Sequence, residues 1–188
     1  MTSLENLVVM AKSKLDFNSK HLAAHILHNQ DFARWSGSAT DKHHHYGHGG
    51  LVQHTWEVVN LCFVTKKALN IKTIDDNELF LAALYHDIGK LYDYQFIDDK
   101  WQGTEHKRLI HHISRSAIMW SNVFEQMPNL NKELHDPVLH AILSHHGQRE
   151  WGSPVAPKTQ VAWLLHLCDG ISARMDDWNK ADVINKNK

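Results

Sequence analysis

The sequence predicts an all-α fold with one small β-hairpin. Hydrophobic residues recur at helical spacing through most of the chain, whereas residues 92–103 alternate aromatic and polar side chains around an Asp-Asp turn. At 188 residues and 43% hydrophobic content, the chain has enough apolar residues for one well-buried core. Because no internal repeat or low-complexity linker divides the chain, we expect a single folded unit.

The first half of the chain contains three helix signals. Thr2 and Glu5 have capping-box spacing before a helix that is expected to reach about residue 15. A second helix is expected to begin near Ser19. Residues 35–50 form a loop by composition, and a helix should follow over residues 51–69.

The second half begins with another capping signal. Asp75 and Glu78 precede the helix that carries LAALYHDIGK, which we expect to end at Gly89. Past the hairpin, the periodicity is again helical, and Asp136 followed by proline is a strong helix start. We expect three further helices, over residues 107–126, 136–146 and 160–175. A frayed polar tail is expected over residues 179–188.

Composition excludes several classes of partner. The net charge of -1 offers no general attraction to polyanions, so long duplex DNA is not an expected partner. Cys62 and Cys168 lie in apolar segments without paired spacing, which indicates reduced core thiols in a cytosolic protein. There is no apolar run of about 18 residues and no signal-peptide pattern, so we expect a cytoplasmic protein without a membrane partner.

Histidine and aspartate carry the chemical signal. His86 and Asp87 stand side by side at an expected helix end, while Asp169 lies among apolar neighbours, where a carboxylate needs a cation or strong donors. Together, seven residues stand where predicted helices begin, end or face inward: His54, His86, Asp87, His112, His145, His146 and Asp169. Their nitrogen and oxygen atoms suit Mn, Fe, Ni, Co or Zn, with Mg possible, and the lack of cysteine argues against a closed structural zinc site.

These seven residues, in this order on helices, resemble the H...HD...D pattern of the HD superfamily of metal-dependent phosphohydrolases and its two-metal subset. The strings GGLVQHT, ALYHDIGK, HHIS, LSHHGQREWGSPVAPKT and LLHLCDGISARMD are similar to the HD domain of YhaM-type 3′-to-5′ exoribonucleases. The resemblance covers roughly residues 32–175. It implies a helical HD-domain bundle over residues 31–178, with N-terminal helices 1–30 packed on it and a polar tail over 179–188.

The resemblance also implies a division of the ligands between two divalent ions. Asp87 would bridge the two ions. His112 is preferred over His111 as a ligand because the family has its histidine directly before an isoleucine. For His145 and His146, the alternative is that one ligates while the other binds solvent or substrate. The first ion would be held by His54, His86, Asp87 and Asp169, and the second by Asp87, His112, His145 and His146.

The activity implied by the resemblance is hydrolysis of phosphodiester bonds in nucleotides or short single-stranded oligonucleotides by a metal-activated water. Short substrates are expected because the oligonucleotide-binding domain that precedes HD in those exonucleases is not in this sequence. One alternative is a phosphodiesterase for cyclic nucleotides or cyclic dinucleotides. Another is a non-catalytic module that senses nucleotides.

Asp87 and Lys90 are the predicted catalytic residues. Lys90 follows the HD pair by one helical turn, so its ammonium either contacts a phosphate oxygen or satisfies carbonyls at the helix end. Arg115, one turn beyond His112, is a candidate for substrate phosphate. Arg149 either binds a further phosphate or is a solvated surface charge.

Aromatic residues supply the remaining substrate candidates. Trp151 and Trp101 either stack on a base or pack within the protein. His48 belongs to the histidine-rich loop HHHYGHGG, residues 43–50, whose members either line the substrate mouth or orient metal ligands.

Overall fold

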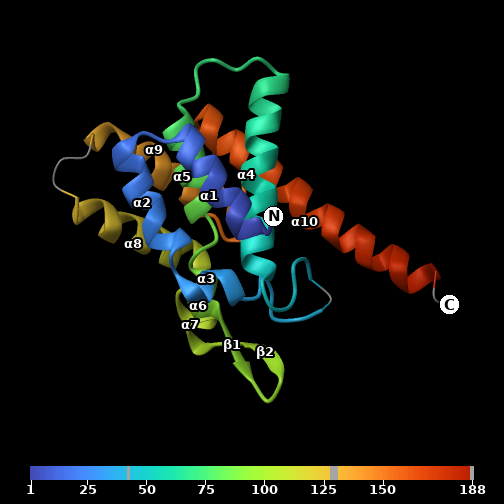
Figure 1. Cartoon of the computed structure of the whole chain (residues 1–188). Coiled ribbons are helices and arrows are strands. Elements are labelled where there is room, and N and C mark those ends of the chain that lie inside the picture. The colour runs from blue at the N-terminus through green and yellow to red at the C-terminus, as the bar shows by residue number, and fades with distance from the viewer. Residues whose placement is uncertain (42, 128–130, 187–188) are drawn as a thin grey trace.

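The computed structural model describes residues 1–41, 43–127 and 131–186, which form helices and one two-stranded antiparallel sheet (Figure 1). The predicted fold class is therefore confirmed. In chain order the elements are α1 Ser3–Lys14, α2 Phe17–Leu27, α3 Gln30–Arg34, α4 Gly50–Ala68, α5 Asp76–Tyr85, α6 Lys90–Asp93, β1 Tyr94–Ile97, β2 Lys100–Gly103, α7 Glu105–Leu109, α8 His112–Glu125, η1 Lys132–Leu134, α9 His135–Ser144, η2 Arg149–Trp151 and α10 Gln160–Lys186.

Helix α5 lies at the centre of the molecule. Every residue from 79 to 85 is buried, and α5 contacts α1, α2, α4, α8, α9 and α10. A helix that is apolar on all sides is stable only when other helices surround it. At its end, the Tyr85 hydroxyl donates to the Leu22 carbonyl at 2.7 Å. The segment that follows α5 is consequently held in a fixed position in the interior.

Side-chain caps define the first helices. The capping box predicted for Thr2 and Glu5 is present. Helix α2 begins at Phe17, two residues before the predicted start, because Asp16 is its cap and accepts from the Ser19 amide at 2.7 Å. The cap predicted at Asp75 is also present.

The single helix predicted over residues 107–126 is wrong, because two helices occupy this stretch. Helix α7 ends at Leu109, and His111 has a left-handed φ of 69°. Helix α8 then starts at His112, whose amide donates to the Asp93 carboxylate at 3.1 Å. A carboxylate at a helix N-terminus satisfies a free amide and complements the helix dipole. The break is therefore set by Asp93, which comes from a different helix.

The predicted hairpin is confirmed. Strands β1 and β2 pair Tyr94 with Gly103 and Ile97 with Lys100, so the two-residue turn is Asp98-Asp99. Both aspartates have positive φ values, 50° and 57°, as a type I′ turn requires.

Helix α10 is longer than predicted. It runs to Lys186 rather than to about residue 175, so the frayed tail predicted from residue 179 is wrong for the described part, and residues 187–188 lie outside it. No glycine or proline occurs over residues 171–186 to interrupt the helix. In Figure 1 the end of α10 extends away from the helical body. Among the described residues, no helix combines the length and hydropathy that a bilayer span requires.

Candidate metal centre

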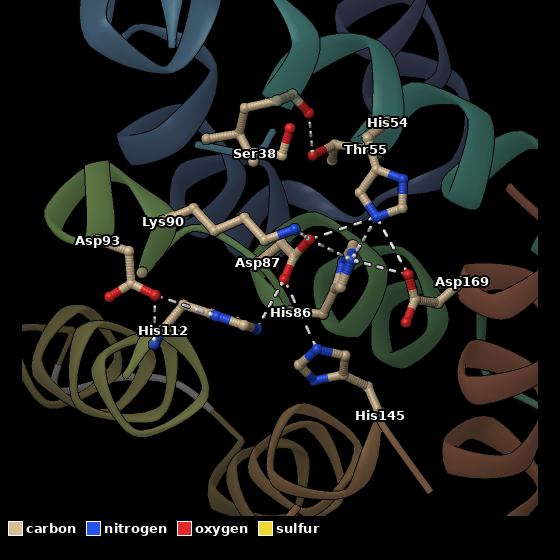
Figure 2. A network of polar contacts seen from close by, with 12 residues as sticks. Ser38, His54, Thr55, His86, Asp87, Lys90, Asp93, His112, His145 and Asp169 are labelled. Atoms are coloured by element: carbon tan, nitrogen blue, oxygen red, sulfur yellow. Dashed lines mark hydrogen bonds and ion pairs between the residues drawn. The ribbon is translucent and has the colours of Figure 1, made fainter. Parts of the chain in front are cut away.

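The Asp87 carboxylate is the centre of the predicted site. It lies 2% exposed in the turn that follows α5. Its Oδ2 lies 3.3 Å from His54 Nε2, 3.4 Å from His86 Nε2 and 2.7 Å from Lys90 Nζ. His54 Nε2 also lies 3.1 Å from Asp169 Oδ1. The structure thus brings together four predicted ligands from α4, the α5–α6 turn and α10 (Figure 2).

The other oxygen of the same carboxylate faces a second group. Asp87 Oδ1 lies 3.3 Å from His112 Nε2 and 3.6 Å from His145 Nε2. His146 joins this group, since ligand atoms of His112, His145 and His146 lie within 4.8 Å of one another. Asp87 Oδ1, His112 Nε2 and His145 Nε2 are buried and have no hydrogen-bond partner in the part of the chain that the structure describes. Unsatisfied buried ligand atoms that converge in this way fit a cation.

Three of the histidines have their ring orientation fixed by the backbone. In each, Nδ1 donates to a main-chain carbonyl, which leaves Nε2 free to act as a ligand. The bonds are His86 to Ala83 at 2.8 Å, His145 to Ile142 at 2.7 Å and His146 to Trp151 at 2.6 Å.

His112 is oriented by Asp93, which sequence reasoning missed. The buried Asp93 carboxylate accepts from the His112 amide, from His112 Nδ1 at 3.2 Å and from His106 Nδ1 at 3.1 Å. Burial opposes ionisation of Asp93, but the hydrogen bonds from His112 and His106 lower its pKa below the ordinary value. No spacing signal marks Asp93, because it lies at the edge of the predicted hairpin.

A second set of missed residues orients His54. His54 Nδ1 lies 3.0 Å from the Ser172 hydroxyl, which donates to Glu57 Oε2 at 2.8 Å. His45 Nε2 also contacts Glu57, at 2.9 Å. Burial opposes the charge on Glu57, yet the hydrogen bonds from His45 and Ser172 lower its pKa to about 2. Ser172 lies three residues after Asp169 on α10, and this helical spacing is the one signal that relates it to the site.

The two carboxylates of the first group act on the pKa of His54, which lies between them. Burial disfavours protonation of His54, but its hydrogen bonds to Asp169 and Asp87 raise its pKa to about 9. Burial also opposes the charge on Asp87, while Lys90 and His86 hold the pKa of that carboxyl well below its usual range. Asp87 and Asp169 thus favour positive charge at the position between them, which is where a cation would be attracted.

Two glycines allow the ligand segments to approach other elements closely. Gly89 has an ordinary φ of -60° and does not end α5, which stops at Tyr85. Its role is steric, because a Cβ there would lie 2.2 Å from the His112 carbonyl oxygen. Helix α9 ends at Ser144, so the predicted end at Gly147 is wrong by three residues. Gly147 has a left-handed φ of 84°, and a Cβ there would lie 2.4 Å from His166 Cε1.

The three predicted cationic residues differ in their contacts and in their exposure. Lys90 is buried and paired with Asp87, so it does not satisfy helix carbonyls as its structural alternative required. Arg115 contacts His106 Nε2 at 3.0 Å and lies over the Tyr92 ring. Arg149 is exposed on η2.

The remaining substrate candidates differ in how closely they pack and in how exposed they are to solvent. Trp101 is 5% exposed and packs against Trp35, with ring centroids 5.1 Å apart. His48 contacts Phe96 and Trp101, at 4.8 Å and 5.5 Å between centroids. Trp151, in contrast, is 52% exposed beside the centre. Trp101 therefore packs within the protein, as one of its two readings required.

Two histidines of the loop over residues 43–50 lie close to the first group. His44 and His45 have ligand atoms within 4.8 Å of His54. Burial, followed by the charge of Lys90, lowers the pKa of His44 to about 3, so this ring is neutral. The His44 ring therefore adds no positive charge beside His54.

A cleft leads to the centre. It has a volume of about 420 Å³ and lies between the 145–151 segment and α10. His145, His146 and Asp169 line one part of it. Ligands from both groups are accordingly accessible from the same side.

Comparisons with known proteins agree with this geometry. A family model described as HD domain matches residues 51–174. The 3'-5' exoribonuclease YhaM of Shouchella clausii (strain KSM-K16) is 33% identical over 157 residues, which cover 82% of this chain and 46% of the relative. The 3'-5' exoribonuclease YhaM of Bacillus pumilus (strain SAFR-032) is 30% identical over 169 residues, covering 87% and 51%. The chain thus spans about half the length of these relatives. No solved structure matches it.

Proposed function

Because the chain belongs to the HD domain family, we propose that it is a metal-dependent phosphohydrolase that cleaves phosphodiester bonds in nucleotides or short single-stranded oligonucleotides. The name of its relatives, 3'-5' exoribonuclease, supports a nucleotide diester as the substrate class. The observation that carries the proposal is the convergence of six candidate ligands around a seventh, the buried carboxylate of Asp87.

The two oxygens of Asp87 suggest how the ligands are shared. His54, His86 and Asp169 would hold one ion together with Asp87 Oδ2. His112, His145 and His146 would hold a second ion together with Asp87 Oδ1. The ligand set contains imidazole and carboxylate but no thiolate, which favours Mn, Fe, Ni, Co or Zn in a site with open positions.

Bound divalent ions supply such a site with an acidified water molecule and neutralise charge on a phosphate group. The chain's own residues determine where this chemistry takes place. Asp87 fixes both ligand groups relative to each other, and the Lys90 ammonium lies 2.7 Å from its Oδ2. Lys90 is thereby placed to donate to a phosphate oxygen bound next to Asp87. The cleft beside Asp169 admits the substrate.

The Asp87→Asn variant tests the central role of this carboxylate. Removing its charge leaves both ligand groups without their shared anion, so we expect near-complete loss of hydrolysis and of bound metal. Elemental analysis, hydrolysis rates and circular dichroism measure the three relevant quantities: metal content, activity and helical structure. Asp177→Asn, an exposed aspartate on α10, is the matched control and should retain activity and metal. Activity in a folded, metal-free Asp87→Asn protein would contradict the proposal.

A substrate panel distinguishes the candidate activities. It comprises single-stranded RNA and DNA oligonucleotides, cyclic nucleotides, cyclic dinucleotides and nucleoside mono- and triphosphates, each with added Mn²⁺. We expect cleavage of short single-stranded oligonucleotides. Activity confined to cyclic substrates would identify the cyclic phosphodiesterase instead, and a loaded protein inactive on the whole panel would identify the sensing module.

A further inference from the structure

The cleft beside the candidate centre combines a polar part and an apolar wall. Its polar part is formed by His145, His146 and Asp169. Its wall is formed by large apolar side chains that are about half exposed, between 48% and 55%: Trp151, Leu167, Ile171 and Met175. A ligand that fills this cleft must therefore have a polar group at one end and an apolar surface at the other.

Trp151 is held at the cleft by the same segment that orients a ligand. Its carbonyl accepts from His146 Nδ1 at 2.6 Å, and the Ser153 hydroxyl accepts from the His146 amide at 3.1 Å. The indole ring lies 6.5 Å from the His166 ring between centroids, at an angle of 31°. The hydrogen bond to its carbonyl holds the main chain of Trp151 next to His146, so the indole ring lies at the cleft beside a candidate ligand.

A cation lies beside the polar part of the cleft. Arg174 lines the cleft and is exposed. Its Nη1 lies 3.8 Å from the place where a Cβ of Gly170 would be, next to Asp169 in the chain. Arg174 has no ion pair within the part of the chain that the structure describes. Its guanidinium is available to an anion that reaches the centre.

We infer that this cleft binds the nucleobase of the nucleotide whose phosphate lies at the candidate centre, with the Trp151 ring as the stacking surface and Arg174 as a phosphate contact. The inference rests on the proposed function. A planar base has the apolar faces that the wall requires, and the attached phosphate has the charge that Arg174 and the centre attract. A phosphoester without an aromatic group would leave Trp151 and Met175 exposed to water, with no gain from their burial.

Two ligands that differ only in the base test this assignment. Equilibrium binding of adenosine 5′-monophosphate and of ribose 5-phosphate is measured with Mn²⁺ present, while product analysis verifies that both ligands stay intact. The wild-type protein should bind the nucleotide more tightly. Trp151→Ala should weaken nucleotide binding about 5- to 150-fold, the range that loss of one base–aromatic stack gives, and should leave ribose 5-phosphate binding unchanged.

Matched variants separate this effect from general damage. Trp178→Ala removes an exposed tryptophan on α10 that does not line the cleft, and it should change neither affinity. Trp151→Phe keeps an aromatic face and should retain most of the preference for the nucleotide. Arg174→Gln should weaken both ligands to the same extent. Unchanged metal content in Trp151→Ala verifies that His146 remains in place.

Equal binding of the two ligands by the wild-type protein would overturn the inference, as would unchanged nucleotide affinity in Trp151→Ala. Self-association that depends on Trp151 and excludes the nucleotide would also overturn it, because the wall would then be covered by a second copy. Failure of the proposed function has a different signature: the nucleotide binds in a Trp151-dependent manner, but no diester of the substrate panel is cleaved.

Discussion

At the residue scale, the site depends on groups that hold the predicted ligands in place. The seven candidate ligands were predicted from the sequence because they stand where predicted helices begin, end or face inward, four of them as adjacent His-Asp and His-His pairs. Asp93, Glu57 and Ser172 were not identified, because they act through hydrogen bonds between elements that are distant in the sequence, and only Ser172 has a helical spacing to a predicted ligand. Motifs therefore indicate which atoms face the centre but not which atoms orient them.

Asp93 is predicted to be a positioning residue for the second group. An asparagine side chain has one acceptor oxygen, whereas the Asp93 carboxylate uses two to accept hydrogen bonds from His112 and His106. In Asp93→Asn, His112 therefore loses its fixed ring orientation. We expect metal affinity at the second group to fall about 10- to 100-fold, with the first group little changed. Metal titration followed by elemental analysis should show one high-affinity ion, compared with the two that we propose for the wild-type protein.

The matched control is Asp98→Asn, an exposed aspartate in the hairpin turn. Asparagine tolerates its left-handed conformation, so this variant should bind metal as the wild-type protein does. Equal weakening of both ions in Asp93→Asn would show that Asp93 supports the fold in general rather than His112 in particular.

At the element scale, the sequence identified helices better than the breaks between them. Caps near Thr2 and Asp75 were recognised because the capping residue and the helix are adjacent. The break between α7 and α8 was missed because its cap, Asp93, belongs to α6. The short α6 itself was also missed, since it lies between the HD turn and the hairpin.

The contact between the HD turn and α8 gives a prediction for Gly89. In Gly89→Ala, the new methyl group would overlap the His112 carbonyl, so α8 must move away from Asp87. We expect the free energy of unfolding to fall by about 1 to 3 kcal/mol, as overpacking typically costs. Urea denaturation measures this change.

Gly103→Ala is the control for this substitution, because a Cβ at Gly103 makes only an ordinary 3.5 Å contact with the Lys107 side chain. It should leave the free energy of unfolding nearly unchanged. If Gly89→Ala were as stable as Gly103→Ala, the close approach of the turn to α8 would not be a requirement of the fold.

At the scale of the whole molecule, the candidate centre joins helices that are far apart in the sequence. Its ligands come from α4, the turn after α5, α8, the end of α9 and α10. The helical class was predictable from periodicity, and the convergence was suggested by the family resemblance. The cleft and its apolar wall were not predictable, because the exposure of Leu167 and Ile171 depends on which faces of α10 the other helices cover.

Metal removal should therefore lower global stability. A ligand that binds only the folded state at 100 times its dissociation constant stabilises a protein by about 2.7 kcal/mol. For a chain of this size, we expect treatment with a chelator to lower the melting temperature by about 5 to 10 °C. Differential scanning calorimetry measures the shift, and Asp87→Asn should show none. An equal shift in that variant would place the stabilising metal elsewhere.

Helix α10 has a consequence beyond the positions of its side chains. Asp169 and Ser172 belong to the same uninterrupted helix as the turns that leave the body in Figure 1. A helix of 27 residues is about 40 Å long and transmits displacement along its axis. Because Asp169, a candidate metal ligand, belongs to the same helix as these outer turns, a tilt of the outer turns would move Asp169 relative to Asp87.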